Sequence, residues 1–267
     1  MKVFLNGKFL EEKNATISIK DHGFLYGDGI FETLLYEHNI IENFNLHLQR
    51  LKKSAKIIAL KLPKFNIENI IQKLVKINNL QKARIRITVT RGENNFQFNS
   101  SPHPTILITT VPLLEHNLRL SRKTCTLKIE NPHHRVKSIQ LFATIQAKQK
   151  MTKLNCSECF FLNQNNEITE GSGSNFFAVK NKAIYTPPSS QCLKGTMRET
   201  VLQIAQKNNI KTHQTKIPYQ SLSEFDECFW TNSIHHIIPI QSIDNKKFTC
   251  IGEITKKIIK LNNYSYS

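Results

Sequence analysis

The chain has 267 residues, enough for one large domain or two medium ones, and its composition is that of an ordinary globular protein. Its formal net charge of +17 raises the question of a nucleic acid or an anionic surface as a partner. The lysines, however, are spread along the chain and alternate with apolar residues at helical spacing, as is typical of solvated helix faces. We therefore expect neither a nucleic acid nor a membrane among the partners.

The compartment is predicted from the cysteines and from the apolar runs. No run is long enough to span a membrane, and the first residues do not resemble a secretory signal. The six cysteines are scattered, so we expect reduced thiols and a cytoplasmic location. Cys156 and Cys159 match CxxC, but no second pair completes a zinc site, so no metal is expected.

The first half of the chain predicts a mixed domain of strands and helices. Its expected elements are a hairpin turning at Asn6-Gly7, two strands within 30–44, a helix capped by Asn45, a helix starting near Asn66, and strands at 83–90 and 105–111. On the strand at 83–90, the isoleucines and the valine alternate with arginines and threonines, which predicts one buried and one polar face.

The second half predicts another mixed domain. Its expected elements are a strand, a helix at about 138–153, strands at 158–163, 175–179 and 183–187, a helix at 195–208, a strand, a strand at 227–232, and a terminal helix. We therefore expect an α+β protein with a small domain at 1–112, a linker at 113–122 and a larger domain at 123–267.

The glycines are concentrated in segments that look functional. The chain has only nine, and six of them lie in "DHGFLYGDGIFE", "EITEGSGSNFF" and "LKGTMRE". In the second of these, Gly171 and Gly173 follow Glu170 directly. Glycine suits a tight turn or a backbone that approaches another group closely. Such a turn could direct Glu170 inward, and the alternative is an acid exposed on the turn.

Two other segments have the residue types that bind or react. Gly195 starts an amphipathic helix, and the free N–H groups at a helix N-terminus suit a phosphate. Lys137 lies where a charged loop gives way to an apolar helix pattern, and a lysine in an apolar pocket is a nucleophile and base. Taken singly, each segment is more typical of a surface lysine, a turn or an ordinary helix start.

In combination, the segments resemble a known family. The motifs "YGDGIFE", "HLQRL", "RVKS", "ITEGSGSNFF", "YTPP…LKGTMR" and "TNS…IIPI" occur in the order and spacing of the class IV aminotransferases, the fold-type IV pyridoxal phosphate enzymes. The resemblance runs from about residue 4 to residue 245. It implies a two-domain α+β enzyme with pyridoxal 5'-phosphate at the domain interface, and a homodimer.

The resemblance also assigns roles to individual residues. Lys137 matches the lysine that binds the cofactor covalently and then moves protons at the reacting carbon of the substrate. Glu170 matches the acid that contacts the pyridine nitrogen and keeps it protonated. The cofactor phosphate would be bound by the residues that match its family site, which are Arg50, the backbone N–H groups of Thr196 and Met197, and Ser233.

Three first-domain residues match positions that line the substrate pocket in the family. They are Tyr26, Phe31 and Arg86, and the arginine is expected to bind a substrate carboxylate. The histidine pairs His133–His134 and His235–His236 have no predicted role, because ordinary polar contacts explain them equally well.

The motifs divide among three reactions known in the family. "TNSIHHIIPI" and "QC…GTMR" favour 4-amino-4-deoxychorismate lyase, which releases pyruvate to give 4-aminobenzoate for folate synthesis, although Asn-Arg after the lysine and an Arg-Gly-Tyr element are missing. "VKSIQLFATIQAKQK" favours a D-amino acid transaminase, but Phe31 stands where a tyrosine is expected. A branched-chain transaminase shares Tyr26, Phe31 and Arg86, but Leu35 replaces an arginine.

The lyase is the leading prediction, and a transaminase that uses 2-oxoglutarate or glutamate is the alternative. A basic binding protein that kept the fold without the chemistry is a more remote one, and the presence of Lys137, Glu170 and Arg50 argues against it.

Overall fold

A computed structural model describes residues 1–93, 103–114, 122–129 and 135–262. The chain divides into two compact units, Met1–Asn117 with Val136–Gln140, and Leu118–Arg135 with Leu141–Ser267. Most of the expected linker lies outside the described residues, so the domain boundaries stay a prediction. Within the described ranges, each helix is too short or too polar to cross a lipid bilayer.

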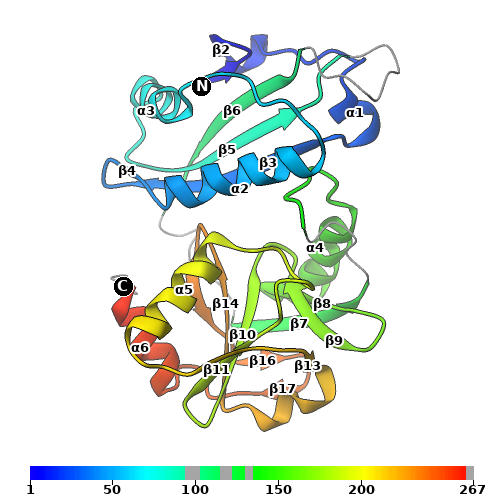
Figure 1. Ribbon diagram of the computed structural model, residues 1–267, viewed down its shortest axis with the longest axis vertical. Helices are drawn as coiled ribbons and strands as arrows, with labels where there is room; N and C mark the ends of the chain where they lie inside the picture. Colours follow the sequence, from blue (N-terminus) through cyan, green and yellow to red (C-terminus); the bar gives the residue numbers. More distant parts are fainter. Residues whose placement is uncertain (94–102, 115–121, 130–134, 263–267) are drawn as a thin grey trace. The chain divides into compact units, whose positions relative to one another are not determined.

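The first unit is built on a six-stranded sheet in which all paired neighbours are antiparallel (Figure 1). The strand order is β2-β1-β6-β5-β3-β4. The strands are β1 (Lys2–Leu5), β2 (Lys8–Glu11), β3 (Gly29–Glu37), β4 (Ile40–Ile41), β5 (Lys82–Thr90) and β6 (Thr105–Pro112). The helices are a 3-10 turn (Glu12–Asn14), α1 (His22–Tyr26), α2 (Phe44–Ile57) and α3 (Ile67–Ile77).

The core of this unit lies between the sheet and helices α2 and α3. The expected alternation on β5 is confirmed, because Ile85, Ile87 and Val89 are buried in this core and Arg86 lies on the opposite face. Leu51 of α2 is buried in the same core, so the apolar face of that helix packs against the sheet. One face of the sheet is therefore left for polar side chains.

The two helices of this unit start differently. Helix α3 begins next to Asn66 as expected, and the Asn66 side chain caps it by accepting a hydrogen bond from the N–H of Asn69 at 3.0 Å. The expected cap at Asn45 is wrong, because α2 begins at Phe44. The N-cap position is taken by Asn43, whose left-handed backbone (φ 49°) turns the chain into the helix.

The described residues of the second unit form two sheets, three α-helices and a 3-10 turn (Figure 1). The five-stranded sheet has the order β12-β11-β10-β14-β15, and the six-stranded sheet has the order β13-β9-β8-β7-β16-β17. The strands are β7 (Lys123–Lys128), β8 (Glu158–Leu162), β9 (Glu167–Gly171), β10 (Asn175–Lys180), β11 (Ala183–Thr186), β12 (Thr212–Gln214), β13 (Ile217–Pro218), β14 (Glu227–Asn232), β15 (His236–Pro239), β16 (Ser242–Ile243) and β17 (Lys246–Lys247). The helices are α4 (Phe142–Leu154), α5 (Thr196–Lys207), a 3-10 turn (Tyr219–Glu224) and α6 (Glu253–Leu261).

The sheets of this unit pack in layers, as the buried strand sequences require. On β10, Phe176 packs with Phe160 and Trp230 in a core shared by both sheets. Its neighbour Phe177 points the other way, into a core with α5 and α6. On β8, Phe161 packs against α4. Because strands such as β10 are covered on both faces, they are continuously apolar and do not alternate.

Candidate functional site

Lys137 lies on a short segment that runs along the edge of β3. The N–H of Phe31 donates to the carbonyl of Lys137 at 2.9 Å, and the N–H of Ile139 donates to the carbonyl of Gly29 at 3.1 Å. These bonds hold residues 137–139 in extended backbone, which is why the helix expected from 138 begins at Phe142. The position of the lysine is thus set by strand pairing.

Two predicted site residues, Arg86 and Lys137, lie against the ring of a third, Phe31. The guanidinium carbon of Arg86 lies 4.0 Å from the centroid of the Phe31 ring, and Lys137 Nζ lies 4.6 Å from the same centroid. Burial, followed by the charge of Arg84, lowers the pKa of Arg86, although a guanidinium keeps its proton in proteins. The arrangement offers a carboxylate a cationic partner beside an apolar wall.

Arg50 belongs to a buried charge cluster that sequence reasoning did not anticipate. Its Nε donates to Glu32 Oε1 at 2.8 Å and its Nη2 to Glu32 Oε2 at 2.6 Å, while His47 Nδ1 lies 2.7 Å from Oε2. Burial opposes the ionisation of Glu32, but Arg50 and His47 outweigh it and lower the pKa of Glu32 to about 2. A glutamate in an apolar strand was the available signal for this cluster.

Burial of His47 favours its neutral form. Burial lowers the pKa of His47, the nearby Glu32 opposes this, and the charges of Arg50 and Lys137 add to the lowering. The effect of Lys137 on His47 links the lysine electrostatically to the Glu32 cluster.

Tyr26 ends α1 and is connected to the Lys137 segment through its backbone. Its carbonyl accepts a hydrogen bond from Gln140 Nε2 at 3.3 Å, and its ring meets that of His22 edge to face at 5.0 Å. The tyrosine is 40% exposed, so the ring is accessible.

In the second unit, Glu170 lies in a strand, which corrects the expected turn. It is the fourth residue of β9 and only 6% exposed, and its Oε2 accepts a hydrogen bond from the N–H of Leu193 at 2.8 Å. The pairing of β8 with β9 shifts register there, so that Thr169 and Glu170 together oppose Phe161. Glu170 therefore sits in a β-bulge, a device that redirects a side chain.

The two glycines after Glu170 differ in what they make room for. A Cβ on Gly171 would lie 2.1 Å from Ser174 Oγ, so the chain itself excludes a larger residue. A Cβ on Gly173 would have no atom within 4 Å, and this residue is exposed. Of these two glycines, only Gly171 lies against other groups of the chain.

The N-terminus of α5 has the features of a phosphate site. Its N-cap, Gly195, has no side chain to bind the first N–H groups, and a Cβ there would lie 1.9 Å from Asn175 Oδ1. Thr196 Oγ1 lies 3.1 Å from Ser233 Oγ, so both hydroxyls are beside the helix start. Met197 is 2% exposed, with its side chain in the core, so it can contribute only its backbone N–H. This set of donors fits a phosphate group.

Asn175 connects the acid to this helix start. Its Nδ2 donates to the carbonyl of Leu193 at 2.8 Å, and the N–H of Leu193 donates to Glu170. Leu193 is therefore hydrogen-bonded to Glu170 through its N–H and to Asn175, the last residue of "EGSGSN", through its carbonyl. Sequence reasoning missed Asn175, although its place at the end of the motif was a signal.

The remaining predicted features lie apart from these contacts. The ring of His235 meets that of Trp230 edge to face at 5.9 Å, and His236 is buried in β15. His133 and His134 lie outside the described residues. No group of three or more His, Cys, Asp or Glu side chains in the described part of the chain is arranged to hold a metal ion.

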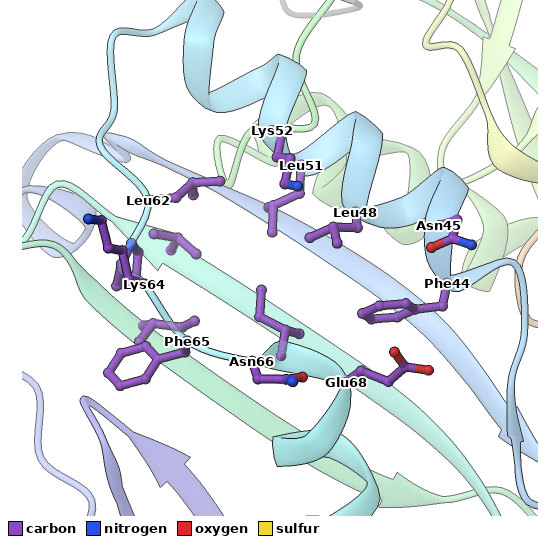
Figure 2. A pocket seen from close by; sticks show the side chains of 14 residues that line it. Phe44, Asn45, Leu48, Leu51, Lys52, Leu62, Lys64, Phe65, Asn66 and Glu68 are labelled. Carbon is purple, nitrogen blue, oxygen red and sulfur yellow. The ribbon is translucent and has the colours of Figure 1, made fainter.

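A cavity of about 430 Å³ in the first unit lies over the core (Figure 2). Leu48 and Leu51 of α2 and Leu62 of the following segment point into it. None of the predicted site residues lines this cavity, so it is not the candidate site.

Comparison with known proteins decides the family. The model of the class IV amino-transferases matches residues 29–243. The chain is 34% identical to a putative branched-chain-amino-acid aminotransferase of Methanocaldococcus jannaschii, over 97% of this chain and 94% of the relative. The chain belongs to the class IV aminotransferase family.

Other class IV relatives have different activities. A D-alanine aminotransferase of Bacillus licheniformis is 26% identical (97% of this chain, 94% of the relative), and an aminodeoxychorismate lyase of Bacillus subtilis is 28% identical (96% and 92%). The crystal structure of a branched-chain aminotransferase of Thermoproteus uzoniensis with norvaline is 26% identical and superposes with a TM-score of 0.87 (98% and 93%).

Family membership confirms three expectations. The chain has the fold of the fold-type IV enzymes, it is an enzyme, and like other class IV aminotransferases it depends on pyridoxal 5'-phosphate. The alternative of a non-catalytic binding protein is set aside on the same ground.

Proposed function

We propose that this enzyme transfers the amino group of an amino acid with an apolar side chain to a 2-oxo acid. The observation that carries the proposal is the position of the Arg86 guanidinium, 4.0 Å from the Phe31 ring centroid, with Lys137 Nζ 4.6 Å from that centroid. A carboxylate can pair with Arg86 while the adjoining side chain contacts the ring. The 34% identical relative is named for branched-chain amino acids, which fits this chemistry.

In this proposal, Lys137 acts as the nucleophile and the proton carrier. Its Nζ would hold the cofactor covalently, and its free amine would move a proton at the reacting carbon of the substrate. Bound pyridoxal 5'-phosphate draws electrons from that carbon and makes its proton acidic. Arg86 orients the substrate through its carboxylate, and Tyr26 and Phe31 line the substrate pocket.

Glu170 is proposed to keep the pyridine nitrogen protonated. Its carboxylate is buried, and one oxygen already accepts a hydrogen bond from Leu193, which limits how it can turn. A fixed, charged acceptor costs little reorganisation when charge develops during the reaction.

The phosphate is proposed to bind at the start of α5. The N–H groups of Thr196 and Met197 and the hydroxyl of Ser233 supply donors, and the helix dipole favours the negative charge. Arg50 adds a cation, and its bidentate contact with Glu32 orients the guanidinium.

Aminodeoxychorismate lyase activity is the second candidate. A relative with that activity is 28% identical to this chain over 96% of its length, and the motifs "TNSIHHIIPI" and "QC…GTMR" favour it. We rank it below amino transfer because Arg86 and Phe31 are shared with the branched-chain group, in which the 34% identical relative is placed by name. A D-amino acid transaminase is less favoured, because Phe31 stands where that group has a tyrosine.

We further propose that the enzyme is a cytoplasmic homodimer that acts on a small anionic amino substrate. This rests on the family resemblance and on the scattered cysteines, which are unpaired within the described residues. Sedimentation equilibrium of the purified enzyme tests the dimer.

Two assays on the enzyme loaded with pyridoxal 5'-phosphate separate the candidates. One follows pyruvate and 4-aminobenzoate released from aminodeoxychorismate, and the other follows glutamate formed from 2-oxoglutarate with leucine, isoleucine, valine or D-alanine. Glutamate formed from the branched-chain L-amino acids supports the proposal. Release of 4-aminobenzoate without amino transfer contradicts it and supports the lyase.

A further inference from the structure

A buried carboxylate lies beneath the turn that follows Glu170. Glu158, the first residue of β8, is 4% exposed. Its Oε1 accepts three hydrogen bonds, from Ser172 Oγ at 2.6 Å, from the N–H of Ser172 at 2.9 Å and from the N–H of Cys159 at 2.8 Å. Two of the three donors belong to a residue that is only two positions from Glu170.

The two residues just before the segment that Glu158 contacts have lost their regular strand pairing. Thr169 and Glu170 form the bulge opposite Phe161, so the β8–β9 ladder does not fix the backbone there. Pairing resumes at Gly171, which is opposite Phe160. Contacts beside the bulge must therefore determine which way the Glu170 side chain points.

Glu158 provides such contacts on the C-terminal side of the bulge. The Ser172 backbone is also held by the Cys159 carbonyl, which accepts from its N–H at 2.9 Å, and by Thr144 Oγ1, which donates to its carbonyl at 3.1 Å. On the other side of the Glu170 carboxylate, the N–H of Leu193 donates to Oε2. The bulge is therefore clamped between fixed groups.

The same carboxylate also packs directly against the residue after Glu170. A Cβ on Gly171 would lie 2.8 Å from Glu158 Cδ and 3.0 Å from Glu158 Cγ. The side chain of Glu158 thus occupies the space that any other residue at 171 would need. This explains why a glycine follows Glu170 directly.

We propose that Glu158 is a positioning residue that holds the bulge and thereby aims the Glu170 carboxylate. The inference rests on the proposed role of Glu170 at the pyridine nitrogen. Glu158 supplies one acceptor oxygen at a fixed distance from its backbone, because the three hydrogen bonds described above all use Oε1. A glutamine at 158 keeps that acceptor, whereas an aspartate withdraws it by one methylene group.

The test compares Glu158→Asp, Glu158→Gln and Glu170→Gln in enzyme loaded with pyridoxal 5'-phosphate. Glu167→Gln is the matched control, since Glu167 is also buried on β9 but contacts Asn163 and Gln191. The readouts are kcat, KM, the absorbance maximum of the bound cofactor and the melting temperature. With Glu158→Asp, we expect kcat to fall about 10- to 100-fold with little change in KM, as for a displaced catalytic group.

The absorbance maximum should shift in the same direction in Glu158→Asp and Glu170→Gln. Glu158→Gln and Glu167→Gln should both keep kcat within about threefold of the wild type. A normal kcat and spectrum in Glu158→Asp, with or without a lower melting temperature, would overturn the inference. Equal loss of kcat in Glu158→Gln and Glu158→Asp would also overturn it, because the acceptor would then not be what matters.

The Glu170→Gln variant shows whether a negative result refutes the positioning role of Glu158 or the proposed role of Glu170. Slow turnover in Glu170→Gln with a normal Glu158→Asp refutes only the positioning role. Normal turnover in Glu170→Gln refutes the role of Glu170 itself.

Discussion

Arg50 and Glu32 form a bidentate ion pair, with Nε to Oε1 at 2.8 Å and Nη2 to Oε2 at 2.6 Å. Glu32 is 1% exposed, and the Arg50 side chain is 12% exposed. The pair connects the strand that carries Phe31 to the helix that carries Arg50. It therefore holds together parts of the first unit on which several proposed roles depend.

The Glu32 cluster should make the protein sensitive to acid. The folded state lowers the pKa of Glu32 from 4.5 to about 2, so its stabilising effect is complete above pH 4.5 and is lost as the pH falls towards 2. The associated loss of unfolding free energy is about 3 kcal/mol. Urea unfolding at a series of pH values measures it.

Glu32→Gln should remove most of this pH dependence between 4.5 and 2 and should lower stability at pH 7, because Arg50 loses its charged partner. Glu11→Gln, on the exposed start of the chain, is the control and should leave the curve unchanged. An unaltered acid transition in Glu32→Gln would mean that other groups cause it.

Lys137→Ala should abolish covalent attachment of the cofactor. Borohydride reduction followed by mass spectrometry should find a pyridoxyl group on Lys137 in the wild type and none in the variant. Lys148→Ala, which changes an exposed lysine of α4, should keep the modification. A pyridoxyl group on a different lysine in the wild type would contradict the assignment of Lys137 as the lysine that binds the cofactor.

Glu170→Gln should leave the cofactor bound but slow turnover. Removal of a fixed charge that acts at the reacting system typically lowers kcat about 10²- to 10³-fold. Steady-state kinetics with a bound-cofactor titration separate loss of turnover from loss of binding. If kcat stays normal with full occupancy, another group must control the ring nitrogen.

Arg86→Met should weaken substrate binding through the carboxylate. Loss of a charge-assisted bidentate partner should raise KM by about tenfold or more. Arg84→Met is the matched control, because Arg84 lies on the same face of β5 but is exposed. Equal effects of the two substitutions would indicate a general electrostatic contribution of the surface.

The sequence was most informative where the signal is local. Alternation on β5 and the start of α3 near Asn66 were predicted, because strand and helix periods place side chains on defined faces. The start of α4 at Phe142 was not predicted, because residues 137–139 follow β3 instead of their own helical pattern. Pairing with a distant strand overrode local preference there.

By itself, the sequence determined the family and the identity of the candidate residues, because ordered motifs require no knowledge of contacts. Only the tertiary structure revealed that Glu170 lies in a β-bulge, that Glu158 supports the adjoining turn and that Glu32 pairs with Arg50. Each of these depends on contacts between residues that lie in different strands, helices or turns. Such contacts arise when strands and helices pack, and a linear pattern does not encode which partner each buried charge will meet.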